Sequence, residues 1–321
     1  MKNFAITGVG GYIAPRHLQA IRDTGHRLVA ALDPHDAVGV LDRWFDKVSY
    51  FREFERFDRH AEKARRRGEA ERIHYLSICA PNYLHDAHIR FALRIDADAI
   101  CEKPLVLNPW NLDALAELER ETGHRVYNVL QLRLHPAIVA LRERMLRRPP
   151  GPPVEIDLTY VTSRGPWYFV SWKGDQERSG GIASNIGVHF FDMLMWIFGP
   201  VQEAEVHLSE PARAGGLLRL ERATVRWFLS VNKEDLPEAS RAQGKSTYRS
   251  LSIGGEEVEF SDGFAELHTE VYRGVLAGRG FGIEDARPCI SLVHRLRTTP
   301  VVVSAPEATH PAVARLRKGA P

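Results

Sequence analysis

The sequence predicts an α/β domain with a parallel sheet, followed by an α+β domain with a mostly antiparallel, open sheet. The first part of the chain alternates near-continuous apolar runs with helical stretches, which is typical of parallel strands covered on both faces. After RRPPGPP (147–153) the pattern changes to the period of two of half-exposed strands. The 321 residues, 44% of them hydrophobic, suffice for two cores. We place the domains at residues 1–132 and 133–321.

Five apolar runs of the first part are expected to be strands. They are FAIT (4–7), RLVAALD (27–33), HYLSICAP (74–81), ADAIC (97–101) and RVYNVLQL (125–132). Helices are expected around residues 17–25, 85–94 and 109–121. The segment between the second and third strands, to about residue 72, is polar and rich in aromatic residues, and we assign it no element.

The second part begins with EIDLTYVTSR (155–164), which alternates between apolar and polar residues. Further strands are expected at 203–209, 215–221, 223–231, 247–255 and 256–260. One strong helix interrupts them at 182–199, and late helices are expected near 264–278 and 284–297. We expect the helices to lie on one face of the sheet and the Pro- and Ala-rich tail from Pro300 to be loosely ordered.

Composition excludes several classes of protein. The net charge is +2, from 43 basic and 41 acidic residues, and the densest basic run (64–67) stands among glutamates, as on a solvated helix face. We therefore expect no nucleic-acid partner. Three scattered cysteines imply no disulfide framework, which favours reduced thiols and a cytoplasmic protein. An apolar strand begins by Phe4, so no signal peptide is expected, and no apolar run approaches the ~20 residues of a membrane helix.

The first strand ends in a glycine-rich turn, GVGGYIAPRH. Gly8 and Gly10 match the first two glycines of the dinucleotide fingerprint, but Ile13 stands where a third small residue is usual. Read as Gly8-x-x-Gly11-x-x-Ala14, the spacing fits a related variant. Either spacing lets the backbone approach a pyrophosphate at a helix N-terminus, although a plain tight turn would show the same glycines. We count the turn, with Tyr12 and Ile13, as cofactor-binding.

Asp33 makes the dinucleotide interpretation more specific. It ends the second strand, 22 residues after Gly11. A carboxylate at this place can accept hydrogen bonds from the ribose hydroxyls of the adenosine and would repel a 2′-phosphate. The sequence therefore favours NAD over NADP, with a simple Asp-Pro turn as the alternative.

Two later strands end in polar or charged turns, APNYLH (80–85) and CEKP (101–104). Ligands of such sheets bind at the carboxyl ends of the strands. We therefore expect five residues of these turns to line one crevice with the cofactor: Pro81, Asn82, His85, Glu102 and Lys103. Lys103 would stand where the nicotinamide meets the substrate, and a surface loop lysine is the alternative.

Together with the helix motif GVHFFD (187–192) and GIEDAR (282–287), these motifs resemble the Gfo/Idh/MocA oxidoreductase family over nearly the whole chain, to about residue 297. The resemblance implies a Rossmann domain followed by an α+β domain whose open sheet supports oligomers, with a homotetramer expected. It also implies that Gln131 contacts the cofactor and Arg133 the substrate. More narrowly, TYVTSRGPWYFVSWKGD (159–175) resembles the branch that oxidises UDP-N-acetylglucosaminuronate at C3. That branch supplies diacetamido uronic acids for bacterial surface polysaccharide such as O-antigen.

Oxidation of a secondary alcohol needs a hydride acceptor and a base. His189 is a plausible base because its ordinary pKa lies near neutrality, and it stands four residues after Asn185 on an otherwise apolar helix. Many family members carry Asp where this chain has Asn185. We expect that amide to bond a substrate hydroxyl or the histidine ring. Lys103 would then hold the reacting oxygen and stabilise alkoxide charge.

A substrate with a diphosphate and a carboxylate needs cations and stacking surfaces. Arg164 and Lys173 offer charge, and nearby aromatic residues offer surface: Tyr160, Trp167 and Tyr168. An exposed loop with ordinary aromatics is the alternative, and Lys173 could instead touch the cofactor. No His, Cys or Asp cluster has metal-ligand spacing, so no metal is expected.

The leading hypothesis is an NAD-dependent dehydrogenase acting on a UDP-sugar. The alternatives are an NAD-using glycosidase, a dehydrogenase of another sugar, and a non-catalytic NAD-binding regulator, which the presence of Lys103 and His189 disfavours. The similar branch reoxidises its bound cofactor with 2-oxoglutarate, but no motif of this sequence indicates whether NADH leaves or is recycled in place.

Overall fold

A computed structural model describes residues 1–258 and 266–318. They form two compact units, one of residues 1–134 with 266–287, the other of residues 135–258 with 288–318. The sequence had placed residues 266–287 in the second domain, and the difference has a packing cause. Val271, Tyr272 and Val275 are buried in the core of the first unit, against Leu18 and its neighbours. This return segment, residues 266–287, therefore completes the first unit.

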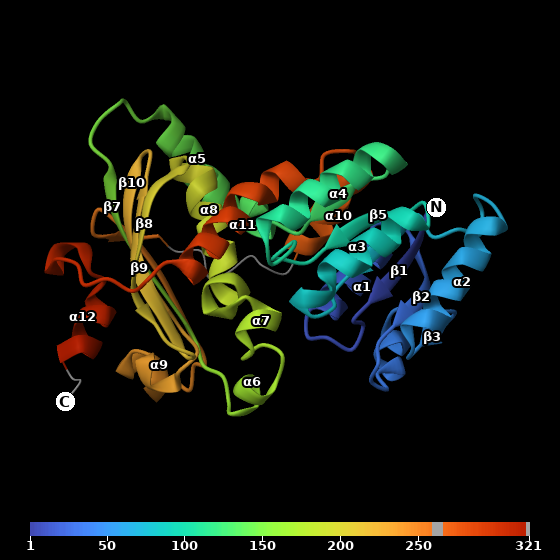
Figure 1. Cartoon of the computed structure of the whole chain (residues 1–321), viewed down its shortest axis with the longest axis horizontal. Coiled ribbons are helices and arrows are strands. Elements are labelled where there is room, and N and C mark those ends of the chain that lie inside the picture. Colours follow the sequence, from blue (N-terminus) through green and yellow to red (C-terminus); the bar gives the residue numbers. More distant parts are fainter. Residues whose placement is uncertain (259–265, 319–321) are drawn as a thin grey trace. The chain divides into compact units, whose positions relative to one another are not determined.

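The first unit contains a six-stranded sheet in the order β3-β2-β1-β4-β5-β6, and all its pairs are parallel (Figure 1). The strands are β1 (Asn3–Thr7), β2 (Arg27–Leu32), β3 (Ser49–Phe51), β4 (Tyr75–Ile78), β5 (Asp98–Cys101) and β6 (Val126–Asn128). The order reverses between β1 and β4, and ligands of open parallel sheets bind at that switch point.

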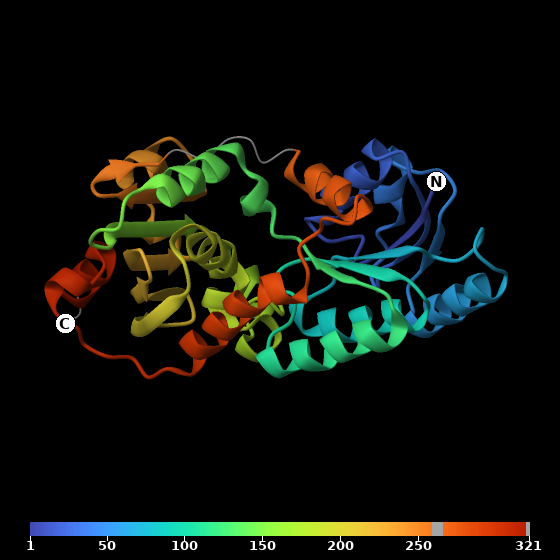
Figure 2. The same ribbon diagram turned by 90° about the horizontal axis from the view of Figure 1, so that it is seen from above.

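Helices cover both faces of this sheet. Helix α1 (Ala14–Asp23) lies beside α10 (Leu267–Leu276) on one face, and α3 (His85–Arg94) beside α4 (Pro109–Thr122) on the other (Figure 2). This division follows from right-handed crossovers, because the chain moves first toward β3 and then back past β1 to β6. The predicted α/β architecture is confirmed.

The unassigned segment after the second strand contains more structure than the sequence indicated. It holds the 3-10 helix η1 (Val38–Arg43), β3 and helix α2 (Phe54–Arg66). The sheet's last strand is shorter than predicted, because Gln131–Leu134 forms the 3-10 helix η3. The first unit also contains the short 3-10 helix η2 (Asn82–Leu84). Helix α11 (Ile283–Thr298) begins in the first unit and continues into the second.

The second unit contains another six-stranded sheet, in the order β12-β11-β7-β10-β9-β8. Strands β7 (Val154–Thr162) and β10 (Ala223–Ser230) pair in parallel and all the other pairs are antiparallel, so the mostly antiparallel prediction is confirmed. The other strands are β8 (Val201–Ser209), β9 (Arg213–Leu220), β11 (Thr247–Ile253) and β12 (Glu256–Glu257). The ends of two predicted elements, at 259–260 and 264–265, lie outside the described residues.

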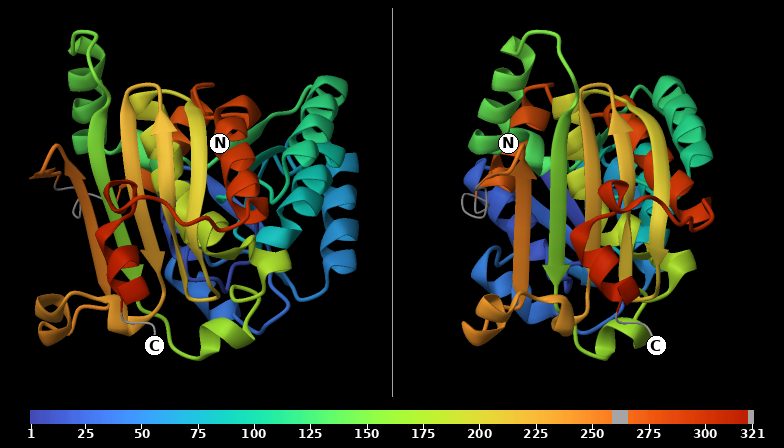
Figure 3. Two further views of the ribbon diagram at one scale, coloured as in Figure 1. Left: turned by 60° about the vertical axis from the view of Figure 1, so that its left-hand side comes forward. Right: turned by 90° about the vertical axis from the view of Figure 1, so that its left-hand side faces the viewer.

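A helix also lies on the second face of this sheet and crosses part of it, which corrects the prediction of helices on one face. Trp227 packs against Phe191 of α8 (Val188–Phe198), and its neighbour Phe228 faces the other side, toward Val313 of α12 (Pro311–Lys318). Figure 3 shows α12 in front of the sheet in its right-hand view. Burial of Ala312 and Val313 anchors the end of the tail, contrary to the expectation, whereas Val301 and Val303 are exposed. Further helices are α5 (Pro136–Arg147), α6 (Trp167–Val170), α7 (Gln176–Ser179), α9 (Glu238–Ala242), η5 (Lys233–Asp235) and η6 (Pro306–Ala308).

The predicted helix 182–199 is built from two kinds of turn. A π-helical segment, Ala183–Gly187 (η4), precedes α8. Among the described residues, one stretch, Gln176–Phe198, is long and apolar enough to span a membrane, but 67% of it is buried inside the fold. That degree of burial is typical of a core helix.

Acid should destabilise both units through buried histidines. Burial lowers the pKa of His88 in the first unit and of His310 in the second to about 4. The unfolded chain takes up these protons near the ordinary pKa of 6.5, so stability present above that pH is lost as the pH falls toward 4. Each histidine should contribute up to about 3 kcal/mol to this loss. Denaturant unfolding at pH 7 and pH 4.5 measures it.

The variant His88→Gln should lose less stability between these two pH values than the unmodified chain. The exposed His35 supplies the control, and His35→Gln should leave the loss unchanged. An equal loss in His88→Gln and in the unmodified chain would contradict the assignment.

Candidate functional site

The glycine turn of the first unit is closely packed. Gly8 has a φ of +76°, and a Cβ at this residue would lie 2.5 Å from the Cys79 carbonyl oxygen. A Cβ at Gly10 would lie 2.8 Å from that of Ala37. A side chain at either glycine would therefore push the turn away from its neighbours. Without side chains, the turn keeps the position at the switch point from which its backbone can approach a bound pyrophosphate.

Asp33 is joined directly to this turn. Its Oδ2 accepts the Gly10 N–H at 2.8 Å and its Oδ1 accepts the His35 N–H at 3.0 Å. The side chain is therefore fixed by backbone donors, and each oxygen retains a lone pair for a further donor. The structure thus brings together the two features that the sequence linked only by spacing.

Helix α1 begins at the end of the turn without a side-chain cap. The Ala14 and Arg16 N–H groups donate to the Gly11 and Ile13 oxygens at 3.1 and 2.9 Å, and Pro15 has no N–H. The positive end of the helix dipole, rather than unpaired N–H groups of its first turn, therefore favours an anion here. Ile13 is the N-cap residue, and the side chain of Tyr12 is 97% exposed. A contact of Tyr12 with the cofactor stays a prediction.

The turns after β4 and β5 lie side by side because their strands pair. Pro81 precedes η2, Asn82 is buried, and Lys103 is partly buried. His85 is buried, with ring nitrogens 2.9 Å from the Ala80 oxygen and 2.7 Å from the Pro104 oxygen. Burial lowers the pKa of His85 and outweighs these carbonyls, so the neutral ring donates to one of them. His85 thereby joins the two turns, and its predicted cofactor contact is untested.

Glu102 has partners that the sequence did not suggest, and its predicted cofactor contact stays untested. Its side chain is buried, and Oε1 accepts from Nε2 of His17 at 3.0 Å and of His268 at 3.1 Å. Burial alone would raise the pKa of Glu102, but these two hydrogen bonds hold it well below its usual range. The structure therefore surrounds an ionised carboxylate with histidines of α1 and α10, two residues that the sequence analysis missed.

Two predicted residues follow β6. The Oε1 atom of Gln131 is buried and has no hydrogen-bond partner within the described part of the chain, as expected of an acceptor that a ligand donor completes. Arg133 donates to the side chain of Asp285 at 3.1 Å and to its backbone oxygen at 2.9 Å. Arg133 thus binds the return segment, and its predicted role toward substrate stays untested.

In the second unit the predicted base lies beside an irregular helix. Asn185 belongs to the π-helical segment and its amide donates to the Tyr168 hydroxyl at 3.1 Å, a partner the sequence did not suggest. His189 is the second residue of α8 and is partly buried. Segments of π-helix occur often at functional sites. Lys103 and His189 belong to different units, and their meeting stays a prediction.

The stretch 164–173 gathers positive charge among aromatic rings. The Lys173 ammonium lies 4.6 Å from the ring centre of Trp172 and 5.8 Å from that of Trp167. Burial, together with Arg164, lowers the pKa of Lys173. A cation that is short of water favours an anionic ligand. Tyr160 packs instead against Phe190, with ring centres 4.7 Å apart.

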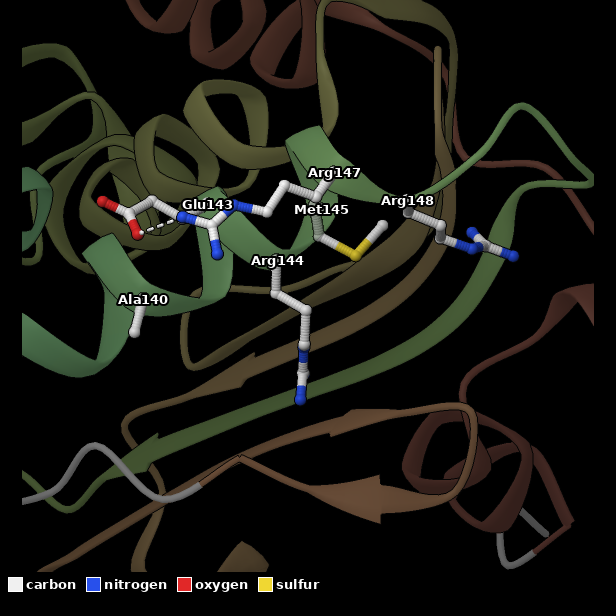
Figure 4. A pocket seen from close by; sticks show the side chains of 6 residues that line it. All are labelled: Ala140, Glu143, Arg144, Met145, Arg147 and Arg148. Atoms are coloured by element: carbon white, nitrogen blue, oxygen red, sulfur yellow. Dashed lines mark hydrogen bonds and ion pairs between the residues drawn. The ribbon is translucent and has the colours of Figure 1, made fainter.

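Two hollows lie among the described residues of the second unit, and only one of them is lined by predicted site residues. The larger, about 570 Å³, lies on α5 and holds no predicted site residue; Figure 4 shows its arginines and Met145. The smaller, about 210 Å³, is lined by Tyr168 and Lys173, and also by Arg297 and Trp227. Of the two, only the smaller hollow contains predicted site residues, and the structure adds Arg297, which no local motif marks, to their surroundings.

Comparison with known proteins places these features in a family. Profiles of the Gfo/Idh/MocA family match residues 2–129, described as "Oxidoreductase family, NAD-binding Rossmann fold", and residues 150–300, described as "Oxidoreductase family, C-terminal alpha/beta domain". The chain belongs to the Gfo/Idh/MocA oxidoreductase family. The resemblance seen in the sequence is confirmed.

Solved structures of this family include a similar enzyme. The WlbA (WbpB) dehydrogenase from Thermus thermophilus is 52% identical, over 97% of this chain and 99% of that chain, with a TM-score of 0.93. It was solved with NAD and UDP-GlcNAcA, and also with NAD and alpha-ketoglutarate. The WlbA dehydrogenase from Chromobacterium violaceum, 16% identical over 92% of each chain with a TM-score of 0.73, shares the fold.

Curated Gfo/Idh/MocA relatives are matched over shorter stretches. The D-glucoside 3-dehydrogenase of Escherichia coli is 27% identical over 130 residues, which is 39% of this chain. The matched stretches span between 27% and 38% of the length of the curated relatives.

The first unit of this Gfo/Idh/MocA chain fits NAD by its own geometry. The glycine turn would hold the pyrophosphate, Asp33 the adenosine ribose, and Gln131 offers a buried acceptor without a partner in the described residues. The observations come from contacts within one unit and agree with the family's NAD-binding domain.

Asp33 should decide which dinucleotide binds. The variant Asp33→Ala should weaken NAD binding and narrow the preference for NAD over NADP, because ribose hydrogen bonds and a repulsive charge are lost. A lost hydrogen bond to a charged group costs about 1.5–3 kcal/mol. Asp33→Asn is the closest comparison: it removes the charge and keeps an oxygen for the Gly10 N–H, at the cost of the acceptor for the His35 N–H. Calorimetry with each dinucleotide measures both variants. Equal affinity of the unmodified chain for NAD and NADP would contradict this role.

Proposed function

We propose that this chain is an NAD-dependent dehydrogenase that oxidises the C3 hydroxyl of UDP-N-acetylglucosaminuronate (UDP-GlcNAcA) to the 3-keto sugar nucleotide. The observation that carries the proposal is the 52% identity, over nearly the full length of both chains, to the Thermus thermophilus dehydrogenase solved with NAD and UDP-GlcNAcA. The 3-keto product would supply the synthesis of diacetamido uronic acids for surface polysaccharide. We place the enzyme in the cytoplasm, as a soluble homotetramer.

The reaction removes a hydride from C3 and a proton from its oxygen, and NAD accepts the hydride when bound. His189 takes the proton, and Lys103 holds the same oxygen and stabilises its developing negative charge. Asn185 holds the Tyr168 hydroxyl, which places an aromatic ring beside the helix that carries the base. These roles need Lys103 and His189 to face one substrate.

The hollow beside Tyr168 suits the charged part of a sugar nucleotide. Lys173 and Arg297 both line it, and burial lowers the pKa of each. Two cations short of water gain more from an anion than exposed cations do. We propose that this hollow and the adjoining Trp167 and Trp172 rings receive the anionic part of the substrate.

Substrate oxidation should be visible in the cofactor. Adding UDP-GlcNAcA to the purified, NAD-loaded protein should raise the absorbance of the NADH band. Adding 2-oxoglutarate should then lower it, because the alpha-ketoglutarate complex of the similar Thermus enzyme supports recycling in place. UDP-N-acetylglucosamine, which lacks the carboxylate, is the matched control. No NADH with UDP-GlcNAcA would contradict the proposal, and glycoside cleavage without net NADH would favour the glycosidase alternative.

Lys103 and His189 should act on one transition state. His189→Ala should lower kcat by about 100- to 10,000-fold, the usual contribution of positioned proton transfer, with NAD binding nearly intact. Lys103→Ala should lower turnover and weaken substrate binding. The double variant should be less impaired than the product of the two losses, because both groups serve one oxygen. Steady-state kinetics measure all three variants.

His124→Ala supplies a control outside the proposed site; His124 pairs with Asp98 at the amino end of β5. Near-full activity of His189→Ala at neutral pH, or two losses that multiply independently, would show that the shared-oxygen mechanism is wrong.

A further inference from the structure

We propose that Glu102 is a positioning residue for Lys103, and that His17 and His268 hold its carboxylate in place. The inference rests on the proposed function, because only there does Lys103 have a reacting oxygen to hold. In this proposal the buried histidine–glutamate–histidine cluster (His17, Glu102 and His268) affects the reaction through Lys103 and does not contact the substrate.

The peptide that joins Glu102 to Lys103 is held at both of its polar atoms. Its carbonyl oxygen accepts from the Asn128 side chain at 3.3 Å, and its N–H donates to Oε2 of Glu102 at 3.2 Å. The preceding peptide is anchored by the Glu102 N–H, which donates to the Ile78 oxygen at 3.0 Å. Because a peptide is planar and includes the next Cα, fixing both atoms fixes the position of the Lys103 Cα, from which the side chain departs.

The carboxylate that holds Lys103 is itself held. Oε1 of Glu102 accepts hydrogen bonds from Nε2 of His17 and of His268. The side chains of His17, Glu102 and His268 are 0%, 8% and 6% exposed. A buried carboxylate without donors would be costly or would become protonated. The two histidines remove that cost, so Oε2 stays an acceptor for the Lys103 N–H.

The protons of the network can be counted. Ser77 and Tyr272 hydroxyls lie 2.5 Å apart, and the Tyr272 hydroxyl lies 2.8 Å from Nδ1 of His17. Burial lowers the pKa of His17. A neutral His17 therefore accepts from Tyr272 at Nδ1 and donates from Nε2 to Glu102. The donors run in one direction from Ser77 to the carboxylate, an arrangement in which each bond strengthens the next.

The same three residues are a possible metal-ligand set, because their ligand atoms lie within 4.8 Å of one another. Zinc takes four protein ligands in a closed structural site, or three and a water in an open one; this group offers three, and its side chains are at most 8% exposed, unlike an open site. Binding a metal through Nε2 would also remove both N–H groups that now satisfy Oε1. The observations favour the hydrogen-bonded cluster, and bound zinc becomes an outcome of the test.

His268 allows the sharpest substitution. Its Nδ1 has no hydrogen-bond partner in the described residues, and its Nε2 contacts Glu102, so replacing the ring removes one polar contact. His268→Leu keeps much of the volume and removes the donor. His268→Gln restores an N–H donor. Glu102→Gln places N–H groups against donors of His17 and His268 or of Lys103, whichever way the amide turns.

Kinetics and hydrogen exchange test the cluster together. His268→Leu and Glu102→Gln should lower kcat between about 10- and 100-fold, as for a misplaced catalytic group, with little change in NAD affinity. His268→Gln should recover most of the loss. Amide exchange of a peptide that contains Lys103 should be faster in both impaired variants. His88→Leu is the matched control: a buried histidine of the same unit, whose loss should lower stability but not kcat or Lys103 protection.

The outcomes separate this inference from the proposed function. If the unmodified enzyme shows no oxidation of UDP-GlcNAcA, the function is wrong, and faster Lys103 exchange in the variants would still support the cluster. If the unmodified enzyme is active, and His268→Leu matches it in kcat and in Lys103 exchange, the positioning role is wrong. About one zinc per chain in the purified protein, lost in His268→Leu, would also overturn it.

Discussion

A buried negative charge must be given hydrogen-bond donors, and at Glu102 those donors come from segments far apart in the chain. His17 comes from the helix that follows the glycine turn, and His268 comes from α10, well over a hundred residues later. The carboxyl edge of the first sheet can therefore reach its final arrangement only when the return segment has packed onto it.

The return segment satisfies other groups at the same edge. The Phe281 oxygen accepts the Asn128 N–H at 2.8 Å, at the end of β6. Asp285 binds Arg133, whose guanidinium also lies 5.2 Å from the Phe281 ring centre. One segment thus supplies partners for a backbone donor, a carboxylate and a guanidinium. We infer that the return segment is a structural requirement of the cofactor-binding unit rather than an extension of the second domain.

The two units offer different chemistry to a ligand. The first presents backbone N–H groups, the Asp33 carboxylate and Lys103 at strand ends, where a dinucleotide can be held mainly by the backbone. The second presents Lys173 and Arg297 beside aromatic rings, and His189, the proposed base, on a core helix. A sugar nucleotide has a diphosphate, a base and sugar hydroxyls, and it needs this second kind of surface.

Local patterns predicted what depends on local interactions. The positions of β1, β2, β4 and β5 and the helix at 85–94 follow from apolar runs and turn residues, and spacing alone linked the glycine turn to Asp33. Helix α12 was missed because its buried face rests on few apolar residues, chiefly Val313. The π-helical segment was missed because its hydrogen bonding leaves no mark in the apolar spacing.

The residues missed at the site share a different cause. His17 and His268 acquire meaning only beside Glu102, and Arg297 only beside Lys173, so no window of sequence contains the contact. The partner of Asn185 was also unforeseen, because Tyr168 stands in a separate short helix. Tertiary contacts of this kind carry most of the geometry of the candidate site.

A lysine with four rotatable side-chain bonds is a poor choice for precise placement unless its backbone is fixed. The peptide between Glu102 and Lys103 is held at its oxygen by Asn128 and at its N–H by the buried carboxylate. Fixing this peptide leaves fewer torsions to be ordered when the substrate binds, which lowers the entropy cost of reaching a reactive geometry. The charged Glu-Lys pair at the end of an apolar strand thus combines two tasks. In our proposal, the buried glutamate fixes the main chain and the lysine keeps its charge for the substrate.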